Sequence, residues 1–553
     1  MQYFFFKYEV CRNYILSLLN IIHYLKNNLF IYVMCGIFGY ISNNLILSKL
    51  LSNNKLILDI SSEKCKHRGP DSSESKIDVY QDFQLYFKFH RLAINGLDEI
   101  SKQPMTRDNV TILCNGEIYN YKELAKKYSI ELKTNSDCEI ILELYHLIGI
   151  QLIKELDGVF SFIIFDKNNG LIYVGHDPIG IRSLYMIQNE EELIISSEMK
   201  CLTEFKGEIK MVEPGVYIEY NLNNKQYEKL TYYNIYYQIK HKDEIFCIEM
   251  IQKLLTNAVK KRLLTDRPFG CLLSGGLDSS IITAIVNKLI NEKELSKKKV
   301  NTFSIGLENS PDLIHAEKMA LHIGTNHKSF IVSEKEMLEA IEPTIQQIES
   351  YDTTTVRASV PMYLLSKFIR EKTDVKVIFS GEGADELSGS YLYFHNAPSP
   401  KDFQNECERL IQNVQFFDVL RGDKTTAGNG LEIRVPFFDK TFVNEYMSID
   451  PELKIVRNGF EKYLLRKSFE KYLPEEVAWR RKDGFSDGVS KNDRPWYQII
   501  NEYTQKKFGM NEKEYYMSIF QKYYKNNEKI IPYEWLPKWC DQSNPSGRLI
   551  LNQ

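Results

Sequence analysis

The sequence lacks the cysteine patterns that mark metal-bound or disulfide-linked proteins. Its ten cysteines form no CxxC pair and have no His-rich surroundings, which argues against structural zinc and a disulfide framework. Reduced thiols in the cytoplasm are therefore expected. A net charge of -3 and the lack of an Arg-rich helix interleaved with aromatics argue against nucleic acid as a main partner.

A long uncharged apolar run is also missing. The first 33 residues are apolar, but Arg12, His23 and Lys26 interrupt them, so no stretch of about 18 uncharged residues could span a membrane. No small-residue cleavage site precedes Met34, which argues against a signal peptide. We therefore expect no membrane partner. Residues 1–33 are predicted to be a non-native or removed extension, with translation starting at Met34.

What is present is the composition of a folded protein of two domains. The chain has 553 residues, 43% hydrophobic and 26% charged. Short apolar runs separated by turns predict a strand-rich layered domain over 35–222, followed by a polar linker over 223–244. Buried strands followed by helices predict a parallel α/β sheet over 245–545. The strand candidates are 36–41, 110–113, 160–166, 171–174, 269–273, 302–307 and 375–379.

A Ser/Gly motif follows the predicted strand 269–273. It reads Ser274-Gly275-Gly276-Leu277-Asp278-Ser279-Ser280 and precedes an apolar helix expected to begin near Ile281. Glycines allow close approach of an anion, and hydroxyls at a helix N-terminus favour phosphate. The GxxxxGK[ST] pattern is absent. The motif resembles the pyrophosphate loop of ATP pyrophosphatases, which implies attack on the α-phosphorus of ATP; the alternative is an ordinary strand-to-helix turn.

A second cluster, SGEGADE at 380–386, follows the predicted strand 375–379 and should lie on the same rim. Its three carboxylates would repel one another without a cation. Asp278 and Asp385 together suit Mg²⁺, which prefers oxygen ligands. The alternative is a solvated acidic loop.

These motifs, with the segments FDVLRGDKTTAGNGLEIRVPFFD, WRRKDGFSDGV and WLPKWCDQSNPSGRL, resemble the synthetase domain of asparagine synthetases over nearly all of the chain after Met34. The resemblance implies ATP as a substrate and roles for individual residues. Leu273 and Ile305 would flank the adenine nucleotide, Ser380 and Gly381 would touch AMP, Glu382 would steady the attack of ammonia, Lys482 would neutralise the adenylate, and Tyr391, Asp418 and Arg421 would hold aspartate.

One stretch departs from the family pattern. After Asp385-Glu386 the family usually has an apolar residue, an aromatic or leucine, and two glycines, whereas this chain has Leu387-Ser388-Gly389-Ser390-Tyr391. If the second glycine position requires a positive φ, Ser390 would strain the loop by about 1 to 2 kcal/mol. The placement of Tyr391 depends on that.

The stretch Met34-Cys35-Gly36-Ile37-Phe38-Gly39 resembles the start of class II glutamine amidotransferases, which are N-terminal-nucleophile hydrolases. In that family the free α-amine of the cysteine is the base that activates its own thiol. Cys35 is therefore expected to become residue one after removal of Met34. With a blocked Cys35, the chain would be an inactive scaffold or sensor.

Companion motifs follow in the family's order: CKHRGPD at 65–71, HRLAIN at 90–95 and NGEIYN at 115–120. The resemblance implies that Arg91 binds the α-carboxylate of glutamine, that Asn115 and Gly116 form the oxyanion hole, and that Glu117 and Asp137 bind the ammonium. Asp137 has a structural rival, a capping box of Ser136 and Glu139. The full expected glutamine-binding set is Arg91, Leu92, Ala93, Ile94, Asn95, Asn115, Gly116, Glu117 and Asp137.

Together these motifs predict synthesis of L-asparagine from L-aspartate and L-glutamine. Cys35 would form a glutamyl thioester and free ammonia, while ATP converts aspartate to β-aspartyl-AMP; the products are AMP, pyrophosphate and glutamate. The expected folds are an α/β layered N-terminal-nucleophile hydrolase fold with antiparallel sheets sandwiched by helices, and an α/β parallel-sheet ATP pyrophosphatase-type fold. A related amidotransferase acting on another carboxylate is an alternative, and a homodimer is one assembly that the sequence allows.

Overall fold

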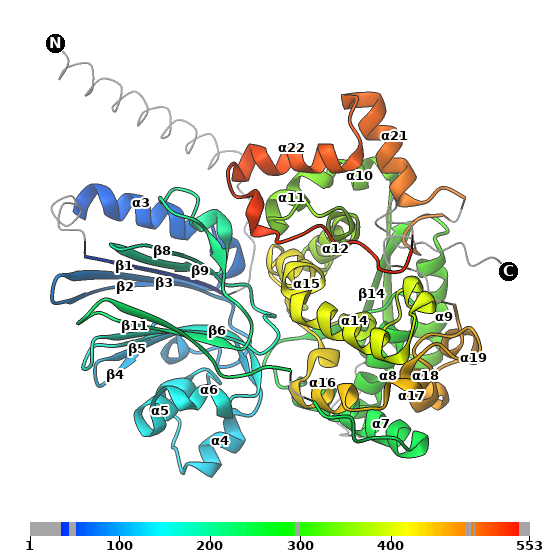
Figure 1. The fold of residues 1–553 in the computed structure, drawn as a ribbon, viewed down its shortest axis with the longest axis horizontal. Coiled ribbons are helices and arrows are strands. Elements are labelled where there is room, and N and C mark those ends of the chain that lie inside the picture. The colour runs from blue at the N-terminus through cyan, green and yellow to red at the C-terminus, as the bar shows by residue number, and fades with distance from the viewer. Residues whose placement is uncertain are drawn as a thin grey trace.

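The computed structural model shows two halves lying side by side, the N-terminal half coloured blue to cyan in Figure 1 and the C-terminal half green to red. The structure describes residues 35–43, 51–235, 237–292, 299–481, 484, 488–491 and 493–540, with the backbone alone for 51–55. Lys482 and the predicted extension 1–33 lie outside these residues.

Two six-stranded antiparallel sheets build the N-terminal half. The first has the order β10-β8-β9-β1-β3-β2 and the second the order β12-β11-β7-β6-β5-β4. The strands of the first sheet are β1 (Gly36–Ser42), β2 (Ser72–Tyr80), β3 (Phe83–Arg91), β8 (Tyr185–Gln188), β9 (Glu192–Ser196) and β10 (Lys210–Met211). Those of the second are β4 (Met105–Arg107), β5 (Val110–Ile118), β6 (Gly158–Asp166), β7 (Leu171–His176), β11 (Val216–Asn221) and β12 (Gln226–Thr231).

Helices cover the outer faces of the two sheets, so this half has four layers. The side chains between the sheets form one apolar core, which includes Ile37, Phe87, Leu113 and Ile163. In Figure 1, α3 lies on the side of the first sheet, and α4, α5 and α6 lie on the side of the second. Their bounds are Leu51–Glu63, Tyr121–Lys127, Glu139–Ile148 and Leu152–Glu155. The layered arrangement predicted from the alternation of strands and turns is confirmed.

The predicted linker 223–244 contains regular structure. Its residues 226–231 form β12, which pairs with β11 in register from Val216↔Thr231 to Asn221↔Gln226. Beyond β12, the chain is tied to the C-terminal half: the Tyr233 hydroxyl donates to Asn444 at 2.9 Å, and His241 contacts Glu445 at 2.7 Å. Polarity led to the linker prediction, but β12 is an edge strand and polar because most of its side chains face solvent.

The C-terminal half is built on a five-stranded parallel sheet of order β15-β14-β13-β16-β17, as predicted. Its strands are β13 (Phe269–Leu272), β14 (Asn301–Leu307), β15 (Asn326–Val332), β16 (Val377–Phe379) and β17 (Glu432–Arg434). The helices are α7 (Glu244–Lys261), α8 (Leu277–Glu292), α9 (Pro311–Ile323), α10 (Glu334–Glu339), α11 (Ile341–Ile348), α12 (Thr353–Lys372), α13 (Ala384–Ser388), α14 (Pro400–Asn413), α15 (Asp418–Ala427), α16 (Lys440–Met447), α17 (Pro451–Lys454), α18 (Tyr463–Phe469), α19 (Glu475–Ala478), α21 (Trp496–Phe508) and α22 (Glu512–Tyr524).

Helix α8 begins at Leu277, four residues before the expected start near Ile281. Asp278 and Ser279 therefore lie in its first turn, where free N–H groups point at the strand ends. Within the described ranges, no helix is both long and apolar enough to cross a bilayer. The nine cysteines in those ranges are all free thiols.

Candidate active sites

Cys35 stands immediately before β1, and the backbone of Leu92 contacts its thiol from both sides. The Leu92 N–H donates to Cys35 Sγ at 3.2 Å, and Sγ donates to the Leu92 carbonyl at 3.2 Å. Burial raises the pKa of the Cys35 thiol to about 12, and the nearby Glu117 and Glu432 carboxylates act in the same direction. The thiol is therefore protonated at neutral pH and needs a base before it can attack a carbonyl.

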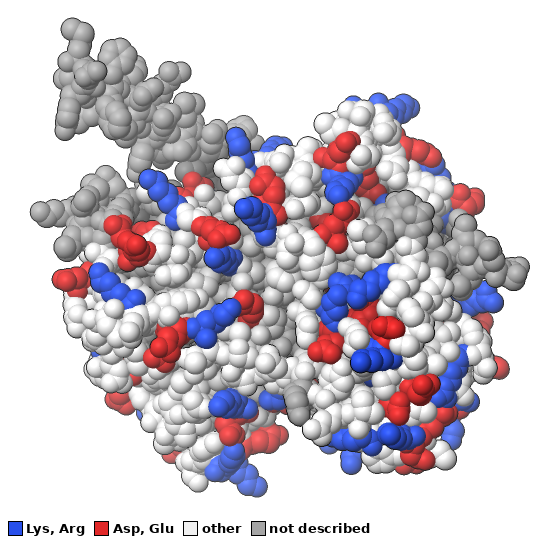
Figure 2. Space-filling model, viewed as in Figure 1, with Lys and Arg blue, Asp and Glu red and all other residues white. Residues whose placement is uncertain are grey.

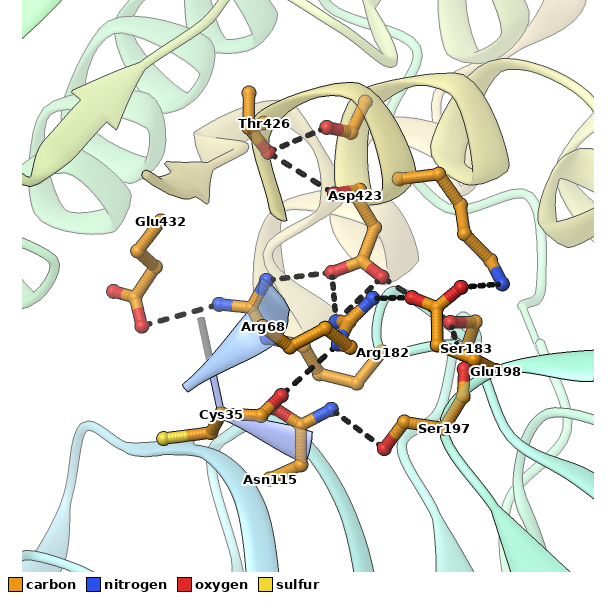
Figure 3. Close-up of polar contacts among 12 residues, drawn as sticks. Cys35, Arg68, Asn115, Arg182, Ser183, Ser197, Glu198, Asp423, Thr426 and Glu432 are labelled. Carbon is orange, nitrogen blue, oxygen red and sulfur yellow. Dashed lines mark hydrogen bonds and ion pairs between the residues drawn. The ribbon is translucent and has the colours of Figure 1, made fainter. Parts of the chain in front are cut away.

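Asn115 and Gly116 lie in the middle of β5, and Figure 3 shows the Asn115 side chain beside Cys35. The Asn115 amide donates to Ser197 Oγ at 3.4 Å, and the same hydroxyl accepts from the Ile37 N–H at 3.1 Å. A Cβ on Gly116 would stand 2.1 Å from the Val159 carbonyl, so this position needs glycine. The two predicted oxyanion donors are thus neighbours on β5, with the Asn115 side chain beside Cys35.

The remaining predicted glutamine residues line the same end of the two sheets. The Arg91 guanidinium donates to the carbonyls of Asp98, at 2.9 Å, and Gly96. Leu92, Ala93 and Ile94 continue from it as a buried segment, in which the Ala93 N–H donates to Asp71 at 2.9 Å. The backbone of the loop that follows β3 therefore holds the Arg91 guanidinium in place.

Glu117 and Asp137 are buried carboxylates. Burial raises the pKa of Glu117 well above its usual range, and the Asp137 charge adds to this rise. Burial also raises the pKa of Asp137 to about 7, although the Ile118 N–H donates to that carboxylate at 2.6 Å and lowers the pKa. Asn95 donates to Glu117, and Arg434 from the other half lies 3.5 Å from it. Such a pair of carboxylates gains from the arrival of an ammonium group.

The alternative capping role near Asp137 is wrong. Helix α5 begins at Glu139 with Cys138 as its N-cap residue, and the N-cap has no side-chain hydrogen bond. The Glu139 carboxylate instead accepts from the backbone N–H groups of Lys133 and Thr134, at 2.7 to 3.1 Å. The loop before α5 folds back on the helix, and the Glu139 side chain holds this loop instead of capping the helix.

A second cavity opens at the carboxyl ends of β13, β14 and β16. Most of the residues predicted for ATP, aspartate and metal line it together: Leu273, Ser274, Gly276, Asp278, Ser279, Ile305, Ser380, Gly381, Glu382, Asp385, Asp418 and Arg421. The two phosphate-type loops touch here, since a Cβ on Gly381 would stand 2.8 Å from the Ser279 nitrogen. Gly275 lies behind the rim with a φ of 71°, against the backbone of His315.

The charged side chains of this cavity pair with one another. Lys462 bridges Asp278, at 2.6 Å, and Asp385. Arg421 lies 2.5 Å from Glu382 and 2.7 Å from Asp418. Glu386 accepts from the Tyr391 hydroxyl, while its burial raises its pKa well above the usual range. The carboxylates of SGEGADE are therefore not a solvated loop.

The expected strain at Ser390 is not found. The left-handed conformation falls on Gly389, with a φ of 61°, while Ser390 is outside that region. The Ser390 hydroxyl donates to Asp385, and the Tyr391 hydroxyl lies 3.5 Å from Asp418. Tyr391 therefore reaches the predicted aspartate residues despite the substitution of serine.

Several lining residues were missed by sequence reasoning. They are Phe303, Ser304, Met362, Leu365, Glu461, Lys462, Arg466, Arg480 and Arg481. Arg480 and Arg481 belong to the quoted segment WRRKDGFSDGV and directly precede Lys482, so the motif could have identified them. Lys462 has no such signal, because it follows an ordinary polar turn.

The predicted metal ligands in this cavity are two carboxylates, Asp278 and Asp385. Among the described residues, no group of three or more His, Cys, Asp or Glu side chains is arranged to hold a metal ion. Asp278 Oδ1 is buried and has no hydrogen-bond partner, so one acceptor there is unsatisfied. Hard oxygen donors beside a phosphate loop fit Mg²⁺ that also binds phosphate oxygens.

On the face shown in Figure 2, acidic and basic side chains are interspersed over both halves.

Comparisons with known proteins agree with this division. The family model described as a glutamine amidotransferase domain matches residues 34–243, and the one described as asparagine synthase matches 250–405 and 396–540. The chain is 40% identical over 564 residues to an asparagine synthetase [glutamine-hydrolyzing] of Gallus gallus, covering 94% of this chain and 98% of the relative. The Homo sapiens relative of that name is 39% identical over 565 residues, with the same coverage. A solved glutamine phosphoribosylpyrophosphate amidotransferase from B. subtilis has a TM-score of 0.31 and 13% identity, covering 63% of this chain and 81% of that one.

Proposed function

The chain belongs to the family of glutamine-hydrolysing asparagine synthetases, and from this premise we propose how its residues make asparagine from aspartate, glutamine and ATP. The observation that supports the assignment of roles is the presence of two separate sites in one chain. One holds the Cys35 thiol beside the Asn115 side chain, and the other is a cavity lined by two touching glycine-containing loops. We assign 35–222 together with β12 to glutamine hydrolysis, the residues from β12 to 244 to the connection, and 245–545 to synthesis.

In the first site, the α-amine of Cys35 acts as the base once the residues before it are gone. An amine with a pKa near ~8 can accept the thiol proton as Sγ attacks the glutamine side-chain amide. Asn115 and the Gly116 N–H then stabilise the negative oxygen of the tetrahedral intermediate. Arg91 pairs with the α-carboxylate of glutamine, and Glu117 and Asp137 pair with its ammonium. Ammonia leaves, and water hydrolyses the thioester to glutamate.

In the second site, ATP lies on the loops of Ser274, Gly276, Ser279, Ser380 and Gly381, with the adenine between Leu273 and Ile305. Arg421, Asp418 and Tyr391 orient aspartate so that its β-carboxylate attacks the α-phosphorus. Asp278 and Asp385 would hold Mg²⁺, which would supply neutralisation of the phosphate charge. Lys482 offsets the charge of the adenylate, and Glu382 orients the ammonia that displaces AMP.

We place this chemistry in the cytoplasm, where thiols stay reduced. Independence from membranes and nucleic acid, and a homodimeric assembly, stay predictions.

The deciding experiment uses protein beginning at Cys35 and its Cys35→Ala variant. Wild-type protein should make asparagine with glutamine or with ammonia and release AMP rather than ADP. Cys35→Ala should lose glutamine-dependent synthesis and keep ammonia-dependent synthesis, because the thiol belongs to the first site alone. Cys247→Ala is the matched control, a buried thiol on α7 in the other half that does not line the second cavity. Unchanged glutamine use in Cys35→Ala, or release of ADP, would contradict the proposal.

A further inference from the structure

A buried cluster of charged side chains lies between the two halves, directly behind the thiol site. Figure 3 shows Arg68, Arg182, Glu198 and Asp423 gathered beside Cys35. Arg68, Glu198 and Asp423 have no exposed side-chain surface, and Arg182 is 1% exposed. Asp423 belongs to α15 in the C-terminal half, and the other three belong to the N-terminal half. The cluster therefore ties the synthetase half to the residues that surround the nucleophile.

Arg68 connects this cluster to Cys35. Its Nε donates to the Cys35 backbone carbonyl at 2.9 Å, and its Nη1 donates to Glu198 at 2.6 Å. Its Nη2 donates to both oxygens of Asp423, at 2.9 and 3.1 Å. Burial alone would lower the pKa of the Arg68 guanidinium, but the charges of Asp423 and Glu198 raise it. Arg68 therefore remains charged in the interior because two carboxylates face it.

The Asp423 carboxylate is directed entirely toward the N-terminal half. Within the described part of the chain, its hydrogen-bond donors are Arg68, Arg182 at 3.0 Å and Ser183 at 3.2 Å. The next residue, Lys424, lies 2.9 Å from Glu198 and also pairs with Glu349. Successive residues of α15 thus contact Arg68 and Glu198, the two members of one ion pair. Loss of the Asp423 charge would leave two buried guanidinium groups facing each other with one carboxylate fewer.

We propose that Asp423 is a positioning residue for glutamine hydrolysis, acting through Arg68 on the backbone of Cys35; this rests on the proposed function of Cys35. In that function the nucleophile and the base belong to the same residue. A shift of the Cys35 carbonyl therefore moves the thiol and the α-amine together relative to Asn115 and Gly116. Small displacements of reacting groups lower rates steeply. The first site is consequently incomplete without the synthetase half.

The test compares wild-type protein beginning at Cys35 with Asp423→Asn, which keeps the shape and removes the charge. We expect kcat for glutamine hydrolysis to fall on the order of 10- to 100-fold. KM for glutamine should stay within about twofold, because Arg91, Glu117 and Asp137 are untouched, and ammonia-dependent synthesis should be retained. A glutaminase kcat within about twofold of wild type overturns the proposal. An equal loss of ammonia-dependent synthesis also overturns it, since that would indicate damage to α15.

A double-variant cycle tests the route through Arg68. If Asp423 acts through Arg68, Arg68→Met with Asp423→Asn should be no slower than Arg68→Met alone. Two independent factors that multiply would contradict the route. Asp157→Asn is the matched control, because it removes another ion pair between the halves, at 2.5 Å from Lys261. If wild-type protein itself hydrolyses no glutamine, the proposed function fails; if only the variants match wild type, this inference alone fails.

Discussion

The two sites treat buried carboxylates in different ways. In the N-terminal site, Asp137 accepts a hydrogen bond from a neutral backbone N–H, and its pKa rises to about 7 through burial. In the C-terminal site, Asp278 and Asp385 share the Lys462 ammonium, and Glu382 pairs with Arg421. In the first site Asp137 is thus held by a neutral donor, whereas Glu117 beside it lies 3.5 Å from Arg434. The second site is already neutralised by its own side chains, with Glu386 as an exception.

This difference matches the ligands proposed for each site. Glutamine carries an ammonium, which can pair with the Asp137 carboxylate in one binding step. Magnesium and ATP carry both signs of charge, so their arrival must exchange partners of ion pairs that already exist. We therefore expect the first site to respond to pH and the second to respond to packing of its loops.

The largest effect is expected from a change in the predicted oxyanion hole, which should affect the first site and not the second. Asn115→Ala removes an amide donor, and glutaminase kcat should fall by about 10² to 10³. Ammonia-dependent synthesis should be unchanged, because the donor lies on β5 of the other half. Steady-state assays with each nitrogen source measure this, with Asn224→Ala on an exposed turn as the control. An equal loss of activity with glutamine and with ammonia would contradict the assignment of separate roles to the two sites.

Gly381→Ala should produce the converse pattern. The added Cβ would stand 2.8 Å from the Ser279 nitrogen and 2.9 Å from the Asp278 carbonyl carbon, so the two loops must separate. A penalty of about 1 to 3 kcal/mol corresponds to a loss of roughly 5- to 150-fold in synthesis. Glutamine hydrolysis provides the internal control. Wild-type KM for ATP in this variant would show that the loops do not need their close contact.

A pH effect should appear in the first site. Because the pKa of Asp137 lies at about 7, the carboxylate becomes protonated below that pH and can no longer attract the glutamine ammonium. KM for glutamine should rise as pH falls below 7, by at most about tenfold per unit for one proton. Asp137→Asn should have a higher KM and should lose the part of the pH dependence that belongs to Asp137, which leaves only the titration of Glu117. A wild-type KM independent of pH would remove Asp137 from glutamine binding.

The smallest effect concerns the loop before Tyr391. Ser390→Gly restores the residue usual in the family, but Ser390 is unstrained and donates to Asp385. We expect a loss of roughly 0.5 to 1 kcal/mol in folding free energy, measured by denaturant unfolding, and synthesis within about twofold of wild type. A marked gain in activity would show that serine distorts the aspartate pocket.

Sequence reasoning predicted β1, β5, β6, β7, β13, β14 and β16 and the loops that follow β13 and β16, because strand periodicity and glycine motifs are local signals. It also grouped Asp278 and Ser380, since parallel strands end at one rim, and it added Arg421 from the resemblance to the family. It could not find Lys462, which reaches Asp278 across 184 positions, or Arg434, which reaches Glu117 across 317. Pairing of distant charges leaves no spacing pattern. The capping box at Ser136 failed for a related reason: the Lys133–Thr134 backbone competes for the Glu139 carboxylate.

The edge strand β12 limits how far the two halves can move relative to each other. The chain that joins them first pairs with β11 as β12 and then contacts α16 through Tyr233 and His241, so it is held by both halves. A connection held in this way does not let the two halves rotate apart as a flexible hinge would. If glutamine is hydrolysed at Cys35 as proposed, the ammonia reaches the adenylate while the halves stay in contact, and small rearrangements of side chains set the timing of the two reactions.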